Sequence, residues 1–355
     1  MLTSETKAKT YAELIRTSWK INDDKRDGNL AEPQDLIKMR NLIYGPYGSY
    51  NLLDLYAPAS ARAVKLPVII SVHGGAWMYG DKELYRYYCM DLAEKGFAVV
   101  NFNYRLGPED SFPTMFADLD RLLYWVWTNA GSYNLDRNNL FLTGDSAGAQ
   151  AASLLATLFT NPEYKEIYLD SMSRLLPNVC RATPAFRLSD YESQNVPISS
   201  WNGVSEEAMT PDESYIFPAL HSSMSFRAVS LNCGVYDVLS LIDNKDSVLD
   251  AFHLYLTSAL RNDSEAVRSA LDAWSYMSQN FPPAYIATAR YDFLKDQAAP
   301  MARHLSDAGV KDVRLKEYGT DGQMTVDHDF QCNMRMPEAS LCREEECAFF
   351  KEFIC

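Results

Sequence analysis

The residue types that could do chemistry are concentrated in one short motif, GDSAG at 144–148. The motif follows the apolar run NLFLT and precedes a stretch rich in alanine and leucine, so a strand, a tight turn and a helix are expected in that order. A serine at such a turn is held in a strained conformation, and small neighbours prevent clashes around it. The motif therefore predicts that Ser146 is a nucleophile for acyl transfer, exposed at the carboxyl edge of a parallel sheet.

A serine nucleophile needs a general base, and five histidines are available. His328 lies in the polar, glycine-containing loop GTDGQMTVDHDF, ten residues beyond the apolar run that ends at Tyr318. A base in that loop can reach the carboxyl edge of the sheet, so we predict His328 for this role. His73 ends an apolar run and is expected to brace the next loop, although it stays an alternative base. The other three, His221, His253 and His304, are expected to be structural.

The acid that orients the base should come from a loop after an intervening strand. Asp292 follows the apolar run AYIATAR by two residues, and we predict that it is this acid. Asp237, which follows the preceding apolar run, is the main alternative. Asp296 is expected to cap or salt-bridge the helix that starts beside it.

Two backbone segments are expected to stabilise the oxyanion that forms when the serine attacks a carbonyl carbon. The helix that begins at Ala147 offers N–H groups and the positive end of its dipole. The motif HGGAW at 73–77 follows the apolar run LPVIISV, and its two glycines let the backbone approach a substrate closely. The amides of Gly74, Gly75 and Ala147 are therefore predicted to form an oxyanion hole.

These loops need a sheet to carry them. Six apolar, β-branched or aromatic runs predict strands at 67–73, 97–104, 139–144, 227–234, 284–290 and 312–318. Two further runs, IKMRNLIY and YNLLDLYAP, are expected to form an antiparallel hairpin at the sheet edge. Helical stretches are predicted at 85–96, 115–131, 147–159 and 297–309. This alternation predicts an α/β fold with a mostly parallel, eight-stranded sheet and helices on both faces.

Two segments do not fit this minimal core, residues 1 to about 35 and residues 160 to 224. The second is rich in serine, proline, asparagine and acidic residues, as long irregular excursions are. Because long loops often form lids or binding walls, we expect both segments to act as cap elements of a single domain over residues 1–355. A surface insertion without functional consequence is the alternative.

Composition restricts the partners and the location. The net charge of -14 argues against nucleic acid or an anionic membrane as a partner. The opening MLTSETKAKTYAEL lacks the apolar run of a secretory signal, and no window of ~18 apolar residues follows, so a cytoplasmic protein is expected. The seven cysteines include no CxxC pair, which argues against a disulfide framework or a zinc site. Three of them, Cys342, Cys347 and Cys355, are expected to pack beside an amphipathic C-terminal helix.

Five motifs resemble, in order, those of the hormone-sensitive-lipase-like esterases and the neighbouring feruloyl and acetyl esterases of the α/β-hydrolase superfamily. They are HGGAW at 73–77, NYRLGPEDSFP at 103–113, GDSAG at 144–148, YDFLKD at 291–296 and DHDF at 327–330. The order serine, acid, histidine is also that of the α/β-hydrolases. The resemblance covers most of the chain. It implies an α/β-hydrolase fold and a carboxylic-ester hydrolase without metal or cofactor, acting on small or short-acyl esters through an acyl-enzyme. It also allows a homodimer, which no sequence feature requires.

The sequence departs from the family pattern at a few positions. Ala76 replaces a third glycine, Ala149 and Gln150 replace a more usual Gly-Asn, and Asp329 follows the histidine where a small residue is common. None of these changes removes a required group. An amidase or arylformamidase stays an alternative, because the same triad can cleave an activated amide. A non-catalytic binding protein on this scaffold, like the plant hormone receptors that lack a working histidine, is a more distant alternative.

Overall fold

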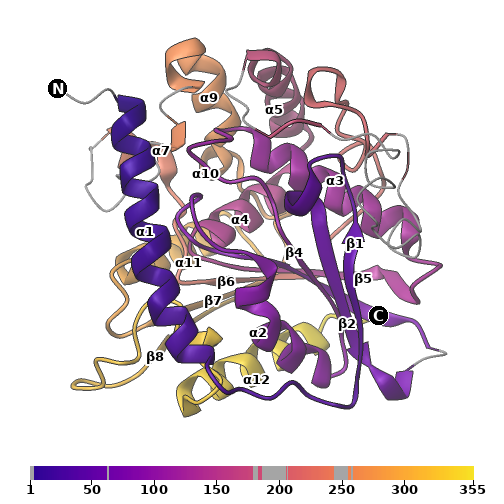
Figure 1. The fold of residues 1–355 in the computed structure, drawn as a ribbon, viewed down its shortest axis with the longest axis vertical. Coiled ribbons are helices and arrows are strands. Elements are labelled where there is room, and N and C mark those ends of the chain that lie inside the picture. The colour runs from indigo at the N-terminus through magenta and orange to yellow at the C-terminus, as the bar shows by residue number, and fades with distance from the viewer. Residues whose placement is uncertain are drawn as a thin grey trace.

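The computed structural model describes residues 4–61, 64–178, 183–185, 205, 207–243, 255–256 and 259–355. One eight-stranded sheet forms its centre, in the order β1-β2-β4-β3-β5-β6-β7-β8 (Figure 1). The strands are β1 (Leu36–Ile43), β2 (Leu52–Pro58), β3 (Leu66–Val72), β4 (Ala98–Phe102), β5 (Leu135–Asp145), β6 (Ala228–Asn232), β7 (Ala284–Ala289) and β8 (Val313–Tyr318). The predicted eight-stranded α/β sheet is confirmed.

The pairing of the strands brings the predicted site loops to one edge. β1 pairs antiparallel with β2, and β2 pairs antiparallel with β4, so the edge hairpin is also confirmed. All other neighbours pair in parallel. Because parallel strands end at the same edge of a sheet, the loops after β3, β5, β7 and β8 lie together there.

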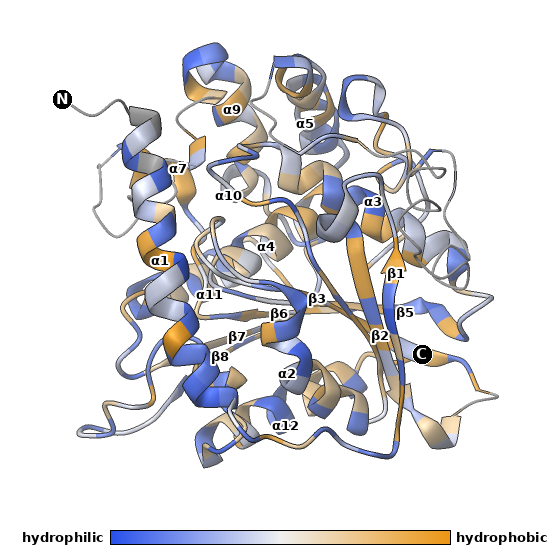
Figure 2. Cartoon of the chain, viewed as in Figure 1, coloured by the Kyte–Doolittle hydropathy of each residue, from blue (hydrophilic) through white to orange (hydrophobic). Residues whose placement is uncertain are grey.

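Helices cover both faces of the sheet, and the strand residues alternate between them. On one face, Ile69, Val99 and Phe141 pack with α2 (Lys82–Glu94) and α12 (Pro337–Lys351). On the other face, neighbours of these residues pack with α3 (Thr114–Asn129), α4 (Ala147–Thr160) and α11 (Lys295–Asp307). Figure 2 shows that the strands between these layers are largely hydrophobic. The inner strands β3, β4, β6 and β7 are therefore buried on both sides, which explains their nearly continuous apolar sequences, whereas the edge strands β1 and β8 carry exposed residues.

The C-terminal helix α12 carries two of the three clustered cysteines. Cys342 and Cys347 are buried free thiols in the cluster between α12 and the sheet, whereas Cys355 lies beyond the helix and is exposed. The expected packing beside a terminal helix thus applies to the first two.

The N-terminal segment forms a long helix, α1 (Ser4–Asp27), which the sequence reasoning anticipated only as a cap element. α1 runs across the molecule beside the main body (Figure 1), with Ala12 and Ile15 buried against it. Arg16 fixes the helix further. Its guanidinium donates to both carboxylate oxygens of Glu109 at 2.9 and 2.7 Å and to the carbonyl oxygens of Met78 and Gly107 at 2.8 Å each.

Four further helices and five 3-10 turns lie entirely within the described residues. The other helices are α5 (Pro162–Leu175), α7 (Val238–Asp243), α9 (Ser264–Leu271) and α10 (Ala273–Tyr276), and the 3-10 turns are η1 (Gly48–Asn51), η2 (Ala59–Ala61), η3 (Leu176–Asn178), η5 (Asp212–Ser214) and η7 (Phe330–Cys332). The expected excursion at 160–224 thus begins with helix α5, and most of its residues 179–206 lie outside the described residues. Within the described ranges, no helix is long and apolar enough to cross a membrane.

Candidate active site

Ser146 lies at the tight turn between β5 and α4. Its backbone has φ 52 and ψ -119, a conformation that a residue other than glycine adopts only under strain. The Ser146 N–H donates to the carbonyl oxygen of Asn232 at 2.9 Å, which ties the turn to β6. A Cβ atom on Gly148 would lie 2.0 Å from the carbonyl oxygen of Val72, so α4 begins directly against β3. The motif predicts this strained turn and the small residues around it.

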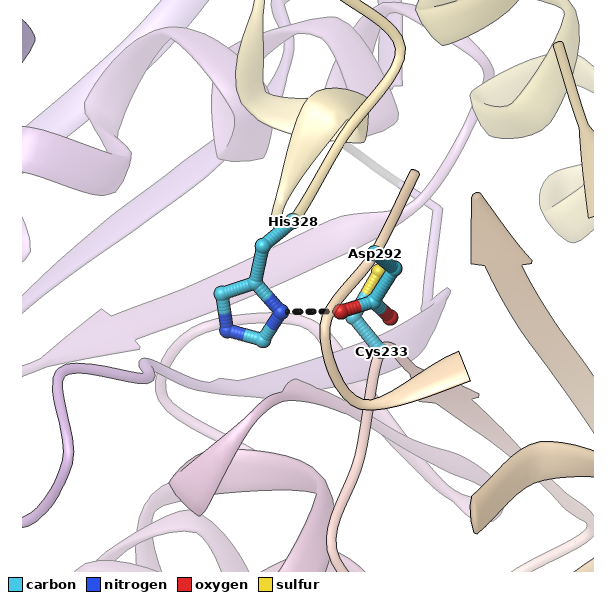
Figure 3. Close-up of side chains that lie close together, drawn as sticks. All are labelled: Cys233, Asp292 and His328. Carbon is cyan, nitrogen blue, oxygen red and sulfur yellow. Dashed lines mark hydrogen bonds and ion pairs between the residues drawn. The ribbon is translucent and has the colours of Figure 1, made fainter. Parts of the chain in front are cut away.

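The predicted base and acid are joined by a hydrogen bond. The Nδ1 atom of His328 lies 2.7 Å from Oδ1 of Asp292, and the second ring nitrogen points away from the acid (Figure 3). The Asp292 carboxylate also accepts from the Leu294 N–H at 2.8 Å and from the Thr288 hydroxyl at 3.0 Å. Burial alone would raise the pKa of Asp292, but the hydrogen bond and charge of His328 and the Leu294 amide hold it below its usual value. Asp292 is therefore an anion that can orient the imidazole.

Cys233 lies behind this pair (Figure 3). One potential ligand atom from each of Cys233, Asp292 and His328 falls within 4.8 Å of the other two, a spacing that a metal site could also have. Ligands on tetrahedral zinc, with bonds of about 2.0–2.1 Å, would lie roughly 3.3 Å apart, whereas Nδ1 and Oδ1 are 2.7 Å apart. That separation fits a shared proton better than a cation. Burial raises the pKa of the Cys233 thiol, so it can donate its proton to Asp292.

The glycine loop after β3 is held by close backbone contacts. Gly75 has φ +111, and a Cβ atom there would lie 2.0 Å from the carbonyl oxygen of Tyr79. The Gly74 N–H, which was predicted to bind the oxyanion, instead donates to the hydroxyl of Tyr85 at 3.0 Å. An oxyanion could accept from the Gly74 N–H only if this bond were broken or shared. The roles of Gly75 and Ala147 as oxyanion donors stay predictions.

Ser146, Gly75 and His328 line one pocket of about 510 Å³. Its sheet wall consists of the loops at the strand ends, with Gly74, Gly75, Ser146, His328 and Asp329. Its helix wall consists of four residues of α1, Trp19, Asn22, Asp23 and Arg26. The rest of the lining includes Tyr79, Leu84, Phe293, Thr325, Asn333 and Met336. The distant loops that carry the predicted serine and histidine therefore meet at a single cavity.

The histidines not chosen as base lie in other environments. His73 is buried and stacks on Tyr104 with ring centroids 4.0 Å apart, and burial lowers its pKa to about 4. A neutral, stacked His73 fits the expected bracing role. The Nε2 atom of His304 contacts the carbonyl oxygen of Trp274 at 2.9 Å. His221 is exposed, and His253 lies outside the described residues.

The alternative acids lie at the starts of other helices. Asp237 accepts from the Ser240 N–H at 3.2 Å at the start of α7. Asp296 lies in the first turn of α11. Of the three candidate acids, Asp292 is the one that contacts His328.

Sequence reasoning missed several residues of the pocket. It expected residues 1 to about 35 as a cap element, but it identified neither the helix α1 nor its pocket-lining residues, although Ala12 and Ile15, three positions apart, already suggest one apolar helix face. It also missed Tyr85, whose hydroxyl donates to Asp145 at 2.6 Å. The departure at Gln150 has a local explanation, because its side-chain oxygen accepts from the indole N–H of Trp77 at 3.4 Å.

Comparison with known proteins finds esterases among the relatives of this chain. Residues 53–191 match the family model described as BD-FAE. The chain is 37% identical to Esterase LipQ of Mycobacterium tuberculosis over 34% of this chain and 30% of that protein. It is 27% identical to Arylacetamide deacetylase of Bos taurus over 72% of this chain and 68% of that protein. The match with LipQ thus spans less than a third of that relative.

Solved structures share the complete architecture. Esterase B from Lactobacillus rhamnosis, in a crystal structure with a C4-C4 SN3 tributyrin phosphonate inhibitor, superposes with a TM-score of 0.74 at 22% identity. The match covers 98% of this chain and 96% of that one. At this identity the likeness demonstrates a common fold.

Proposed function

We propose that this chain, which has the fold of the solved α/β-hydrolase esterases, is a serine carboxylic-ester hydrolase. Ser146 is the proposed nucleophile, His328 the general base and Asp292 the acid that orients the base. One observation carries the proposal: a 2.7 Å hydrogen bond joins His328 to a buried Asp292 beside a strained Ser146, and serine and histidine line the same pocket. The esterases among the relatives support it.

The proposed reaction follows from the positions of these groups. His328 accepts the Ser146 proton at Nε2 as the hydroxyl oxygen attacks the ester carbonyl, while Asp292 stabilises the resulting imidazolium. The amides of Gly75 and Ala147 donate to the oxyanion. The imidazolium returns its proton to the leaving alcohol, which leaves an acyl-enzyme on Ser146. Water then attacks the acyl carbon with the same base and releases the acid.

The nucleophile is tested with Ser146→Ala and p-nitrophenyl acetate. We expect kcat to fall by at least about 10⁴-fold, with an unchanged circular dichroism spectrum, because removing a triad serine removes the covalent route. Ser153→Ala, in the same helix, is the matched control and should retain activity. Residual turnover by pure Ser146→Ala protein close to that of the wild type would refute the assignment.

The size of the pocket favours small esters. A cavity of about 510 Å³ that must hold both the acyl and the alcohol part leaves little room for a long chain. We therefore propose small acetylated, short-acyl or aromatic esters as substrates. Across a series of p-nitrophenyl esters, kcat/KM should fall steeply from acetyl and butyryl to long acyl chains. A preference for long chains would contradict this proposal.

Hydrolysis of an activated amide is a second candidate. It is favoured by the similarity over 72% of this chain to a protein named for deacetylating arylacetamides, and the same triad serves both reactions. Comparing the turnover of N-formylkynurenine with that of phenyl acetate separates the two. A kcat/KM higher for the formamide would move the proposal to an arylformamidase.

Location and assembly stay predictions of the sequence. We propose a cytoplasmic enzyme with small-molecule ester substrates, and a homodimer is compatible with the resemblance. The hydrogen-bonded His328 and Asp292 support catalysis over the alternative of a non-catalytic binding protein. Fractionation of the native host and sedimentation of the purified chain test location and assembly.

A further inference from the structure

Two acidic side chains, Asp145 and Asp329, lie beside the proposed triad without belonging to it. Oδ2 of Asp329 is 3.4 Å from Nε2 of His328, the nitrogen that must accept the serine proton. Oδ1 of Asp329 is buried and has no hydrogen-bond donor among the described residues. Asp145 and Asp329 lie close enough for their carboxyl groups to influence each other's protonation. The two carboxyl groups are therefore neighbours next to the base.

Asp145 connects this pair to the glycine loop. Its Oδ2 accepts from the Tyr85 hydroxyl at 2.6 Å, and the same hydroxyl accepts from the Gly74 N–H at 3.0 Å. A Cβ atom on Gly74 would lie 2.6 Å from Oδ2 of Asp145, so the loop rests directly on the carboxyl group. A series of neighbouring polar groups thus runs from the glycine loop through Tyr85 and both acids to His328.

Two neighbouring carboxyl groups inside a protein cannot both be charged, because the repulsion is too strong at low dielectric constant. A proton held between them also supplies the donor that the buried Oδ1 of Asp329 otherwise lacks. The environment of both carboxyl groups also favours a bound proton. Burial and the neighbouring Asp329 raise the pKa of Asp145, while burial and the charge of Asp292 raise the pKa of Asp329 to about 8.

We propose that Asp145 and Asp329 share one proton and act together as positioning residues for the base and the glycine loop. The pair then carries a single negative charge, part of it 3.4 Å from Nε2. That charge stabilises the imidazolium formed during attack from the Nε2 side, as Asp292 does from the Nδ1 side. The inference rests on the proposed esterase function and adds two residues to it.

Other titratable groups surround the pair and the imidazole and must be constant in any test. They are Arg26 and Asp23 of α1, Tyr85 of α2, Cys233 after β6, Asp292 after β7, Asp327 beside the histidine and Cys332 of η7. Arg26 is already paired with Asp23 and Asp27 at 3.0 and 2.7 Å. Isosteric changes at the pair leave all of these groups in place.

The two amide variants move the charge in opposite directions. Asp329→Asn and Asp145→Asn each put a neutral amide where one carboxyl group was, so the shared proton is no longer needed. One negative charge remains in each variant, on Asp145 in the first and on Asp329 in the second. In Asp329→Asn the charge moves away from Nε2, so the acid limb of the kcat/KM profile should shift by about 0.5 pH unit to lower pH. In Asp145→Asn the charge is concentrated on Asp329, and the limb should shift to higher pH by a similar amount.

Asp327→Asn is the matched control, because it removes an acid on the same loop that faces solvent. Its shift should be smaller than either of the others, since water and salt screen an exposed charge. Shifts of both pair variants in the same direction, no shift in Asp329→Asn, or an equal shift in Asp327→Asn would each overturn the proposal. If Asp145→Asn does not fold, the shift in Asp329→Asn decides alone.

A second measurement needs no turnover. The NMR titration of the His328 imidazole, assigned by its loss in His328→Gln, is followed in Ser146→Ala protein with and without each pair variant. The midpoints should shift in the same opposite directions as the kinetic limbs. Because this readout does not depend on ester hydrolysis, constant midpoints would refute the pair even in an active esterase. Shifted midpoints in a chain without esterase activity would refute the function alone.

Discussion

The sheet wall and the helix wall of the pocket are built in different ways. The sheet wall is held by backbone: Ser146 has φ 52, Gly75 has φ +111, and Gly148 approaches the carbonyl of Val72 so closely that no side chain fits. The helix wall is an ordinary helix attached by side chains. The Tyr79 hydroxyl donates to Asp23 at 2.6 Å, and the Arg16 guanidinium donates to Glu109. The sheet wall therefore fixes the chemistry, whereas the helix wall can vary without disturbing it.

The largest effect is expected at the acid of the sheet wall. Asp292→Asn keeps the shape but loses the charge and favours the wrong imidazole tautomer, so kcat should fall by about 10⁴-fold. Steady-state kinetics with p-nitrophenyl acetate measures it. The control is Asp237→Asn, at the alternative acid, which should stay within about twofold of wild type. Equal losses in the two variants would make Asp292 no different from its alternative.

A smaller loss is expected at the glycine loop. Gly75→Ala forces a Cβ atom to within 2.0 Å of the Tyr79 carbonyl oxygen at a positive φ, so the loop must shift and its amide leaves the oxyanion. The expected loss in kcat is on the order of 10²-fold. Gly131→Ala is the matched control, because a Cβ atom there meets nothing within 4 Å. Full activity in folded Gly75→Ala protein would contradict a role for this amide.

The contrast between the walls also explains what the sequence could predict. The strands, the tight turn at Ser146 and the choice of Asp292 and His328 follow from local patterns, because periodicity and tight-turn chemistry act over a few residues. The bond between Gly74 and Tyr85 could not be foreseen, since it depends on how α2 packs over the loop. A cap role was expected for residues 1 to about 35, but the contacts of α1 could not be foreseen, because they are with loops far away in the sequence.

Asp329 shows most clearly what the sequence alone cannot predict. The sequence marked it as a departure from the family pattern, yet gave no reason for it. The reason requires knowing that its carboxyl group is a neighbour of Asp145, which lies on another strand end. A residue that breaks a local rule at a functional site is thus a signal whose meaning appears only in three dimensions.

On the helix wall, effects should appear in binding more than in turnover. Arg16→Ala removes four hydrogen bonds that hold α1 on the loops. Because both partners of the ion pair are partly exposed, we expect KM to rise about threefold with kcat nearly unchanged. Arg16→Lys keeps the positive charge but loses the planar group that makes two parallel hydrogen bonds to Glu109. Its KM should lie between those of the wild type and Arg16→Ala. A tenfold or larger loss in kcat would show that the helix wall takes part in the chemistry.

The smallest expected effect is on thermal stability, and it arises at Asp329 on the sheet wall. The pKa of Asp329 is raised to about 8, against about 3.9 in an unfolded chain. Between these values the folded protein holds the shared proton, which the unfolded chain has released, so the pair of Asp145 and Asp329 lowers stability as pH rises from about 4 to 8. Asp329→Asn removes the effect. The Tm of this variant minus that of the wild type, measured by calorimetry, should be a few degrees larger at pH 8 than at pH 5. Asp296→Asn, at an exposed acid, should show no such pH-dependent gain. An equal difference in Tm at both pH values would mean that packing, and not the bound proton, causes the difference in stability between the variant and the wild type.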